Sequence, residues 1–131
     1  MWVGDADRND EFHGEAHEVI ESIRLGRSPL GLTTDFIIDE MVTLLGKRKG
    51  FGARAAADVG KFIIASPRVI TVFADESMLS ESIGVYAKYA GRLSLTDVLS
   101  TVVMKRYSVK TIFSHDSDFD VVTGIRRLTS P

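Results

Sequence analysis

The chain has 131 residues, of which 44% are hydrophobic and 26% charged, and its formal net charge at pH 7 is −2. This balance is typical of one globular domain and excludes a disordered or fibrous chain, while the small negative charge excludes a domain that binds nucleic acid through net charge alone. The sequence contains no Cys, which excludes disulfide frameworks, thiolate zinc sites and cysteine nucleophiles.

No apolar run approaches the roughly 20 residues that a membrane span needs. The first residues, MWVGDADRND, do not have the pattern of a signal peptide. The sequence has no internal repeat, linker or low-complexity tract. We therefore expect a cytoplasmic protein with no membrane partner, built as a single domain over residues 1–131.

Apolar spacing predicts three helices in the first half of the chain, over Glu11–Arg24, Asp35–Gly46 and Ala53–Ala65. Thr33 and Thr34 are residue types that favour the N-cap of the second helix. The apolar face expected for that helix consists of Phe36, Ile37, Met41, Leu44 and Leu45. The segments between the helices are expected as a connector or short strand over Ser28–Leu32 and a basic turn over Lys47–Gly52.

The second half alternates expected strands and helices. The β-branched run Arg68–Ala74 predicts a strand, as do Lys110–Ser114 and the residues around Gly124–Leu128. Helices are expected over Glu76–Ala90 and, after Ser94, over Leu95–Tyr107. Short strands interleaved among dominant helices favour an α/β sandwich with a small, mostly parallel sheet.

Glu40 is an acid on the apolar side of a predicted helix. With about 100° of rotation per residue, it falls within the apolar half of Asp35–Gly46, whereas Asp35 and Asp39 fall on the solvent side. Burial of a carboxylate costs several kcal/mol unless a partner charge, hydrogen bonds or a metal compensates. Glu40 therefore points into a shared acidic pocket, forms a salt bridge to a nearby Lys or Arg, or lies at an edge position that reaches water.

Asp97 and Asp116 also have both a structural and a functional interpretation. Asp97 lies three residues after Ser94, where it can complete a capping box. Asp116 and Asp118 follow an expected strand, and ligands bind at the carboxyl ends of parallel strands, although Asp is also common in turns. An EF-hand is excluded because Val121 and Arg127 stand where Gly and Glu are needed.

Together, Glu40, Asp97 and Asp116 suggest one acidic site. Clustered carboxylates repel one another unless they are neutralised, and a hard divalent cation with oxygen ligands is the usual solution. Mg²⁺ or Mn²⁺ held in this way can activate water for attack on a phosphate. A nearby basic cluster can either meet phosphates or form a solvated turn, and it consists of Lys47, Arg48, Lys49 and Arg54.

The sequence resembles PIN-domain proteins, and among them the VapC-type toxins of toxin–antitoxin pairs. Four segments carry the resemblance in the family's order, namely DRNDEFHGEA (Asp7–Ala16), LTTDFIIDEMVTLL (Leu32–Leu45), LSLTDVLS (Leu93–Ser100) and TIFSHDSDF (Thr111–Phe119). The resemblance extends from about Asp7 to Leu128.

This resemblance implies a PIN-like three-layer α/β/α sandwich around a small, mostly parallel sheet, and a Mg²⁺- or Mn²⁺-dependent ribonuclease. Glu40, Asp97 and Asp116 would surround the metal, Asp118 would be an accompanying acid, and Ser114 would help to order the site. The implied partners are an RNA substrate, an antitoxin protein that occupies the cleft, and a second copy in a homodimer. The RNA target and the number of metal ions stay open.

The family pattern opens with a hydrophobic strand that ends in an Asp, and this strand and Asp are not found here. Its loss would leave unpaired sheet edges and remove one metal ligand. Three interpretations follow: Met1 is internal to a longer gene product, which we prefer; the chain is an inactive relative; or Asp5 or Asp7 replaces the Asp. The alternative function is therefore a catalytically impaired PIN-like module that acts by protein–protein binding.

Overall fold

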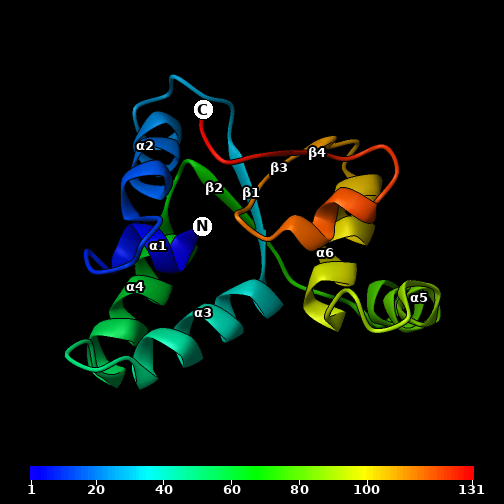
Figure 1. Cartoon of the computed structure of the whole chain (residues 1–131), viewed down its shortest axis with the longest axis horizontal. Helices are drawn as coiled ribbons and strands as arrows, with labels where there is room; N and C mark the ends of the chain where they lie inside the picture. The colour runs from blue at the N-terminus through cyan, green and yellow to red at the C-terminus, as the bar shows by residue number, and fades with distance from the viewer.

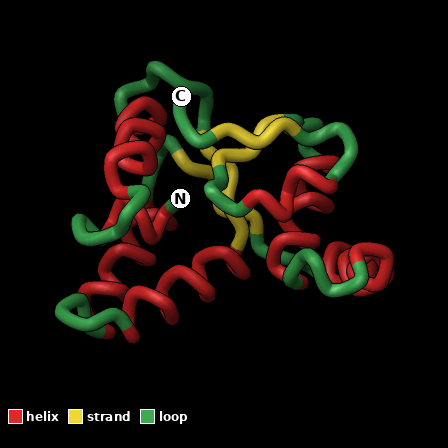
Figure 2. The backbone as a smooth tube through the Cα atoms, viewed as in Figure 1, coloured by secondary structure: helices red, strands yellow, loops and turns green.

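A computed structural model describes residues 1–131. Six α-helices surround four short strands in the centre of the molecule (Figures 1 and 2). The helices are α1 (Trp2–Ala6), α2 (His13–Arg24), α3 (Asp35–Lys47), α4 (Ala53–Ala65), α5 (Glu76–Tyr86) and α6 (Leu95–Arg106). The strands are β1 (Gly31–Thr34), β2 (Val69–Val72), β3 (Thr111–Phe113) and β4 (Arg126–Leu128), and two 3-10 helices are η1 (Ala87–Tyr89) and η2 (Ser117–Val121). None of the helices is long and apolar enough to cross a membrane.

Every helix and strand expected from the sequence is present, with bounds that differ by a few residues. The structure adds α1, which the sequence pattern did not predict. This five-residue helix is fastened to β1 because the Trp2 indole Nε1–H donates a hydrogen bond of 3.2 Å to Thr33 Oγ1. The chain start is therefore held against the first strand.

The four strands form two separate parallel pairs rather than one sheet. β1 pairs with β2, with Gly31 opposite Val69, and β3 pairs with β4, with Thr111 opposite Arg126. The parallel pairing agrees with the sequence prediction. The prediction of one small sheet needs correction, because β1 and β3 each have one strand neighbour and are not paired with each other.

Two helix starts are fixed by side-chain caps of the kind expected from the sequence. The Thr34 side chain accepts a hydrogen bond from the Ile37 N–H at the start of α3. Ser94 and Asp97 form a complete capping box at the start of α6. Since a cap satisfies backbone N–H groups that have no partner within the helix, these residues set where α3 and α6 begin.

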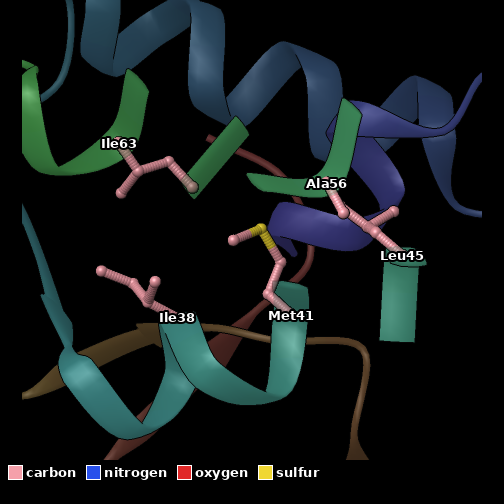
Figure 3. Packing of buried hydrophobic residues seen from close by; sticks show 5 residues of the cluster. All are labelled: Ile38, Met41, Leu45, Ala56 and Ile63. Atoms are coloured by element: carbon pink, nitrogen blue, oxygen red, sulfur yellow. The ribbon is translucent and has the colours of Figure 1, made fainter. Parts of the chain in front are cut away.

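One hydrophobic cluster joins α3 to α4 (Figure 3). It consists of Ile38, Met41, Leu45, Ala56 and Ile63. The two helices approach closely at Gly60, where an added Cβ would lie 2.9 Å from Val42 Cγ2. The buried stripe of α3 differs from the expected one, because Ile38 is buried and Leu44 is 56% exposed.

Helix α6 is the most buried helix of the fold. Eight of its twelve residues are buried. Leu99 and Val103 pack with Val72 of β2 in one cluster, and Val98 packs with Leu93 and Val122 in another. A helix that is buried on several sides holds its first turn in a fixed position, and Asp97 lies in that turn.

Leu45 and Leu44 are adjacent but differ in burial, so they form a matched pair for testing the α3–α4 core. We expect Leu45→Ala to lower the free energy of unfolding by about 2–5 kcal/mol, because it leaves a cavity at a fully buried position. Leu44→Ala should change it by less than about 0.5 kcal/mol. Urea denaturation followed by circular dichroism measures the free energy of unfolding of both variants. Equal losses for the two variants would contradict the assignment of Leu45 to the buried face of α3 and of Leu44 to its exposed face.

Candidate functional site

A cavity of about 540 Å³ lies between β1 and β3. More than half of its lining residues are hydrophobic, and they come from α2, α3, α6 and both strands. Its polar lining includes Glu40 of α3, Asp97 of α6 and Ser114, which follows β3. Side chains from distant parts of the chain thus share one concave site, which is the usual form of a ligand-binding site.

Glu40 lines this cavity but is exposed. Of the alternatives that the sequence left open for Glu40, the structure agrees with the edge position that reaches water, although the helical wheel put this residue within the apolar half of its helix. The buried stripe of α3 runs through Ile38, Met41 and Leu45, so Glu40 lies beside the stripe rather than on it. Its carboxylate therefore reaches both the cavity and solvent, and no buried partner charge is needed to compensate it.

Asp97 both caps the start of α6 and lines the cavity. Its Oδ2 accepts hydrogen bonds from Ser94 N–H at 3.1 Å and from Ser94 Oγ–H at 2.8 Å, while the Asp97 N–H donates to Ser94 Oγ at 3.1 Å. The residue is half-buried and lines the cavity. Because the capping bonds use Oδ2, the other carboxylate oxygen, Oδ1, lies outside the capping box.

Asp116 and Asp118 lie on the loop that follows β3. The Asp116 carboxylate caps η2, since its Oδ1 accepts a hydrogen bond of 2.8 Å from the Asp118 N–H. The Asp116 N–H in turn donates to Ser114 Oγ at 3.1 Å. Ser114 and Phe119 line the cavity, whereas the two acids between them do not.

The structure therefore brings together two of the four acids that the sequence analysis proposed for one site. Glu40 and Asp97 share the cavity, and Asp116 and Asp118 lie on an adjoining loop. No group of three or more His, Asp or Glu side chains is arranged so that it could hold a metal ion. The donor types present, carboxylate and hydroxyl oxygens, are those that hard divalent cations prefer.

His115 lies on the same loop and contributes contacts that the sequence pattern does not indicate. Its ring stacks on Phe12 with centroids 4.2 Å apart, and its Nε2 forms a hydrogen bond of 2.9 Å with Glu15 Oε2 of α2. These contacts tie the loop that carries Asp116 to α2. No sequence signal could have found them, because the partners lie about a hundred positions away.

Arg48 is not available for phosphates, unlike the rest of the predicted basic cluster. Its guanidinium forms ion pairs with Asp7 at 2.7 Å and Asp10 at 2.8 Å. The hydrogen bond from Arg48 lowers the pKa of the Asp7 carboxyl. Desolvation opposes ionisation of Asp10, but hydrogen bonds from Phe12 N–H and from Arg48 still give a lowered pKa.

Asp5 and Asp7 were the two candidates to replace the Asp that ends the first strand of the family pattern. Asp5 Oδ1 forms a hydrogen bond of 2.9 Å with His17 Nδ1, and Asp7 is held by Arg48. Neither acid lines the cavity. The structure therefore gives both carboxylates partners on other elements.

The architecture is that of a PIN domain of the VapC type. No protein-family model matches the sequence, and a search of curated proteins finds no match. A similar solved structure is VapC20 from Mycobacterium tuberculosis, a toxin that cleaves the sarcin-ricin loop. The two share 24% sequence identity and a TM-score of 0.79, over 91% of this chain and 87% of VapC20. At this identity the similarity establishes the fold.

The Arg48 ion pairs predict a dependence of stability on pH. Because the folded state lowers the pKa of Asp7 and Asp10, the pairs stabilise the protein above the ordinary carboxyl pKa, near pH 4, and this contribution is lost as the pH falls through the folded-state pKa. Arg48→Met should therefore lower the thermal midpoint at pH 7, and its difference from the wild type should shrink as the pH falls below about 4. Thermal denaturation across this range measures the effect.

Lys49→Met is the matched control, since Lys49 is an exposed cation next to Arg48 with no ion pair. The thermal midpoint of Lys49→Met should equal that of the wild type at every pH. A difference in thermal midpoint between the wild type and Arg48→Met that stays constant from pH 7 down to pH 2 would contradict the role given to these ion pairs.

Proposed function

We propose that this protein is a metal-dependent ribonuclease and the toxin of a toxin–antitoxin pair. The observation that carries the proposal is that Glu40 and Asp97, from two different helices, line one cavity. The PIN fold and the similarity to VapC20, which cleaves the sarcin-ricin loop, support this reading of the two acids. The proposed partners are an RNA substrate and an antitoxin protein, and we expect a homodimer in the cytoplasm.

Glu40, Asp97 and Asp116 would hold Mg²⁺ or Mn²⁺, with Asp118 as an accompanying acid. When bound, such an ion supplies an activated water and stabilises the charge that develops on a phosphate. Glu40 is exposed and Asp97 keeps Oδ1 outside its capping box, so both can offer an oxygen without loss of the fold. The Asp116 carboxylate accepts the Asp118 N–H through Oδ1 alone, so its Oδ2 lies outside that bond and could serve as a ligand.

Lys47, Lys49 and Arg54 would position the RNA backbone. All three are exposed: Lys47 is the last residue of α3, the helix that carries Glu40, Lys49 follows it, and Arg54 lies in the first turn of α4. Exposed cations attract phosphates through a field that salt screens, so their contribution to RNA affinity should weaken as ionic strength rises. Arg48, held by Asp7 and Asp10, instead fixes the end of α3 against the segment that follows α1.

A second candidate function is a PIN-like module that has lost catalysis and acts by protein–protein binding. The absence of an assembled group of three metal-ligating side chains favours it. Calorimetric titration with Mn²⁺ separates the two candidates. The wild-type protein should bind Mn²⁺ more tightly than the Asp97→Asn/Asp116→Asn variant if the site holds metal, and equally weakly if it does not.

Asp97→Asn is the direct test of the nuclease proposal. We expect cleavage of RNA in Mg²⁺ to fall by on the order of 100-fold or more, because the variant loses a charged ligand while its amide oxygen can still accept the capping bond from Ser94. Gel analysis of cleavage products measures activity, and circular dichroism checks that the fold is retained.

Asp39→Asn is the matched control, because Asp39 is an exposed acid on α3 that does not line the cavity. It should cleave RNA at the wild-type rate. If the wild-type protein cuts no RNA in Mg²⁺, or if Asp97→Asn cuts as fast as the wild type, the ribonuclease proposal is wrong.

A further inference from the structure

Residues 114–120, which we call the acidic loop, follow β3 and carry Asp116. Ser114, before Asp116, and Phe119, after it, both line the cavity. Within the loop, Asp116 N–H donates to Ser114 Oγ, and Asp118 N–H donates to Asp116 Oδ1. Both bonds are exposed and join residues only two positions apart. Because exposed local bonds open readily, they do not by themselves hold the acidic loop in one shape.

Arg127 of β4 joins the two ends of the acidic loop. β4 lies beside β3, its parallel partner (Figure 1). The Nε–H and an Nη2–H of Arg127 donate to the two carboxylate oxygens of Asp120, at 2.8 and 2.9 Å. An Nη1–H of the same guanidinium donates to the carbonyl oxygen of Ser114 at 3.2 Å. One planar group thus connects residue 114 to residue 120, and the paired bonds to Asp120 fix its orientation.

The contacts of Arg127 reach Asp116 through Ser114. Ser114 N–H donates to Leu128 O at 3.0 Å, so both backbone polar groups of Ser114 are bonded to residues of β4. Its side-chain oxygen in turn accepts the Asp116 N–H at 3.1 Å. Arg127 is half-buried, which limits the freedom of its side chain. A change in the bonds of Arg127 would therefore displace Ser114 and, with it, Asp116.

The charge of Arg127 acts on Asp116 without a hydrogen bond between the two side chains. The hydrogen bond to Asp120 raises the pKa of Arg127, and the charge of Asp116 acts in the same direction. The guanidinium donates to Asp120 and Ser114, so it occupies neither carboxylate oxygen of Asp116. A cation near a metal ligand repels the metal ion, so the charge of Arg127 by itself would weaken metal binding. Its hydrogen bonds have the opposite effect if they order a ligand.

We propose that Arg127 is a positioning residue for the metal site: by joining the two ends of the acidic loop, it holds Asp116 beside the cavity that Glu40 and Asp97 line. This inference rests on the proposed function, in which Asp116 is a metal ligand. A loop that is ordered before the ion arrives does not have to be ordered during binding, so the hydrogen bonds of Arg127 raise the affinity for the ion.

Three variants break the connection, namely Arg127→Gln, Arg127→Lys and Asp120→Ala. Arg127→Gln removes the charge and the paired bonds, whereas Arg127→Lys keeps the charge but not the planar guanidinium. Arg126→Gln is the matched control, because Arg126 is an exposed neighbour on β4 whose side chain has no ion pair. The bond from His115 to α2 remains in every variant, so circular dichroism should show that the fold is retained.

The first measurement is NMR relaxation of the backbone amides in the metal-free protein. In the three variants that break the connection, the order parameters of Asp116 and Asp118 should fall from about 0.85, a value typical of rigid backbone, to below about 0.6. Arg126→Gln should keep the wild-type values. Unchanged order parameters in Arg127→Gln would overturn the proposal, whether or not the protein cleaves RNA.

The second measurement is calorimetric titration with Mn²⁺. Arg127→Gln and Arg127→Lys should both bind Mn²⁺ at least about tenfold more weakly than the wild type, while Arg126→Gln should bind it no more weakly. The direction separates positioning from charge, because removal of a cation alone would strengthen the binding of Mn²⁺.

The two proposals fail in different ways. Binding of Mn²⁺ by Arg127→Gln that equals or exceeds that of the wild type would overturn the positioning role and leave the metal site in place. A wild-type protein that binds no Mn²⁺ would overturn the metal-dependent ribonuclease, and the positioning role of Arg127 with it, even if the order parameters show that Arg127 orders the acidic loop.

Discussion

The capped starts of α3 and α6 are the constraint on which the geometry of the candidate site depends. Thr34 is both the last residue of β1 and the N-cap of α3, so the direction of the strand sets where the helix begins. Ser94 and Asp97 fix the start of α6 through reciprocal hydrogen bonds. Two short-range interactions thus hold Glu40 and Asp97 on the wall of one cavity. A carboxylate that also caps its own helix has little freedom to move, and such preorganisation favours ligand binding.

Local signals in the sequence were sufficient to predict most of the helices and strands of the fold. The helical spacing of apolar residues and the cap residues Thr34 and Ser94 predicted the longer helices within a few residues. Helix α1 was missed because five residues are too few to show a period. The split into two strand pairs was missed because pairing is decided by contacts between distant segments, which periodicity does not report. The exposure of Leu44 and burial of Ile38 depend on the direction from which α4 packs.

The candidate site was predictable in part, and the differences have electrostatic causes. Asp97 was expected to cap its helix or to serve the site, and the structure gives it the cap and the cavity position together. Glu40 reaches the cavity from an exposed position, so the burial cost expected for it does not arise. Arg48 could not be separated from Lys47 and Lys49 by sequence, since its acidic partners follow α1, far away along the chain. The contacts of His115 could not be predicted for the same reason.

A double-mutant cycle in RNA cleavage most directly tests whether Glu40 and Asp97 act as one site. Glu40→Gln, Asp97→Asn and the double variant would be compared with the wild type in Mg²⁺ at equal RNA concentration. Residues that serve one catalytic unit are strongly non-additive, so the double variant should be about as active as the weaker single variant. Losses that multiply, as for two independent positions, would contradict a shared site in the cavity between β1 and β3.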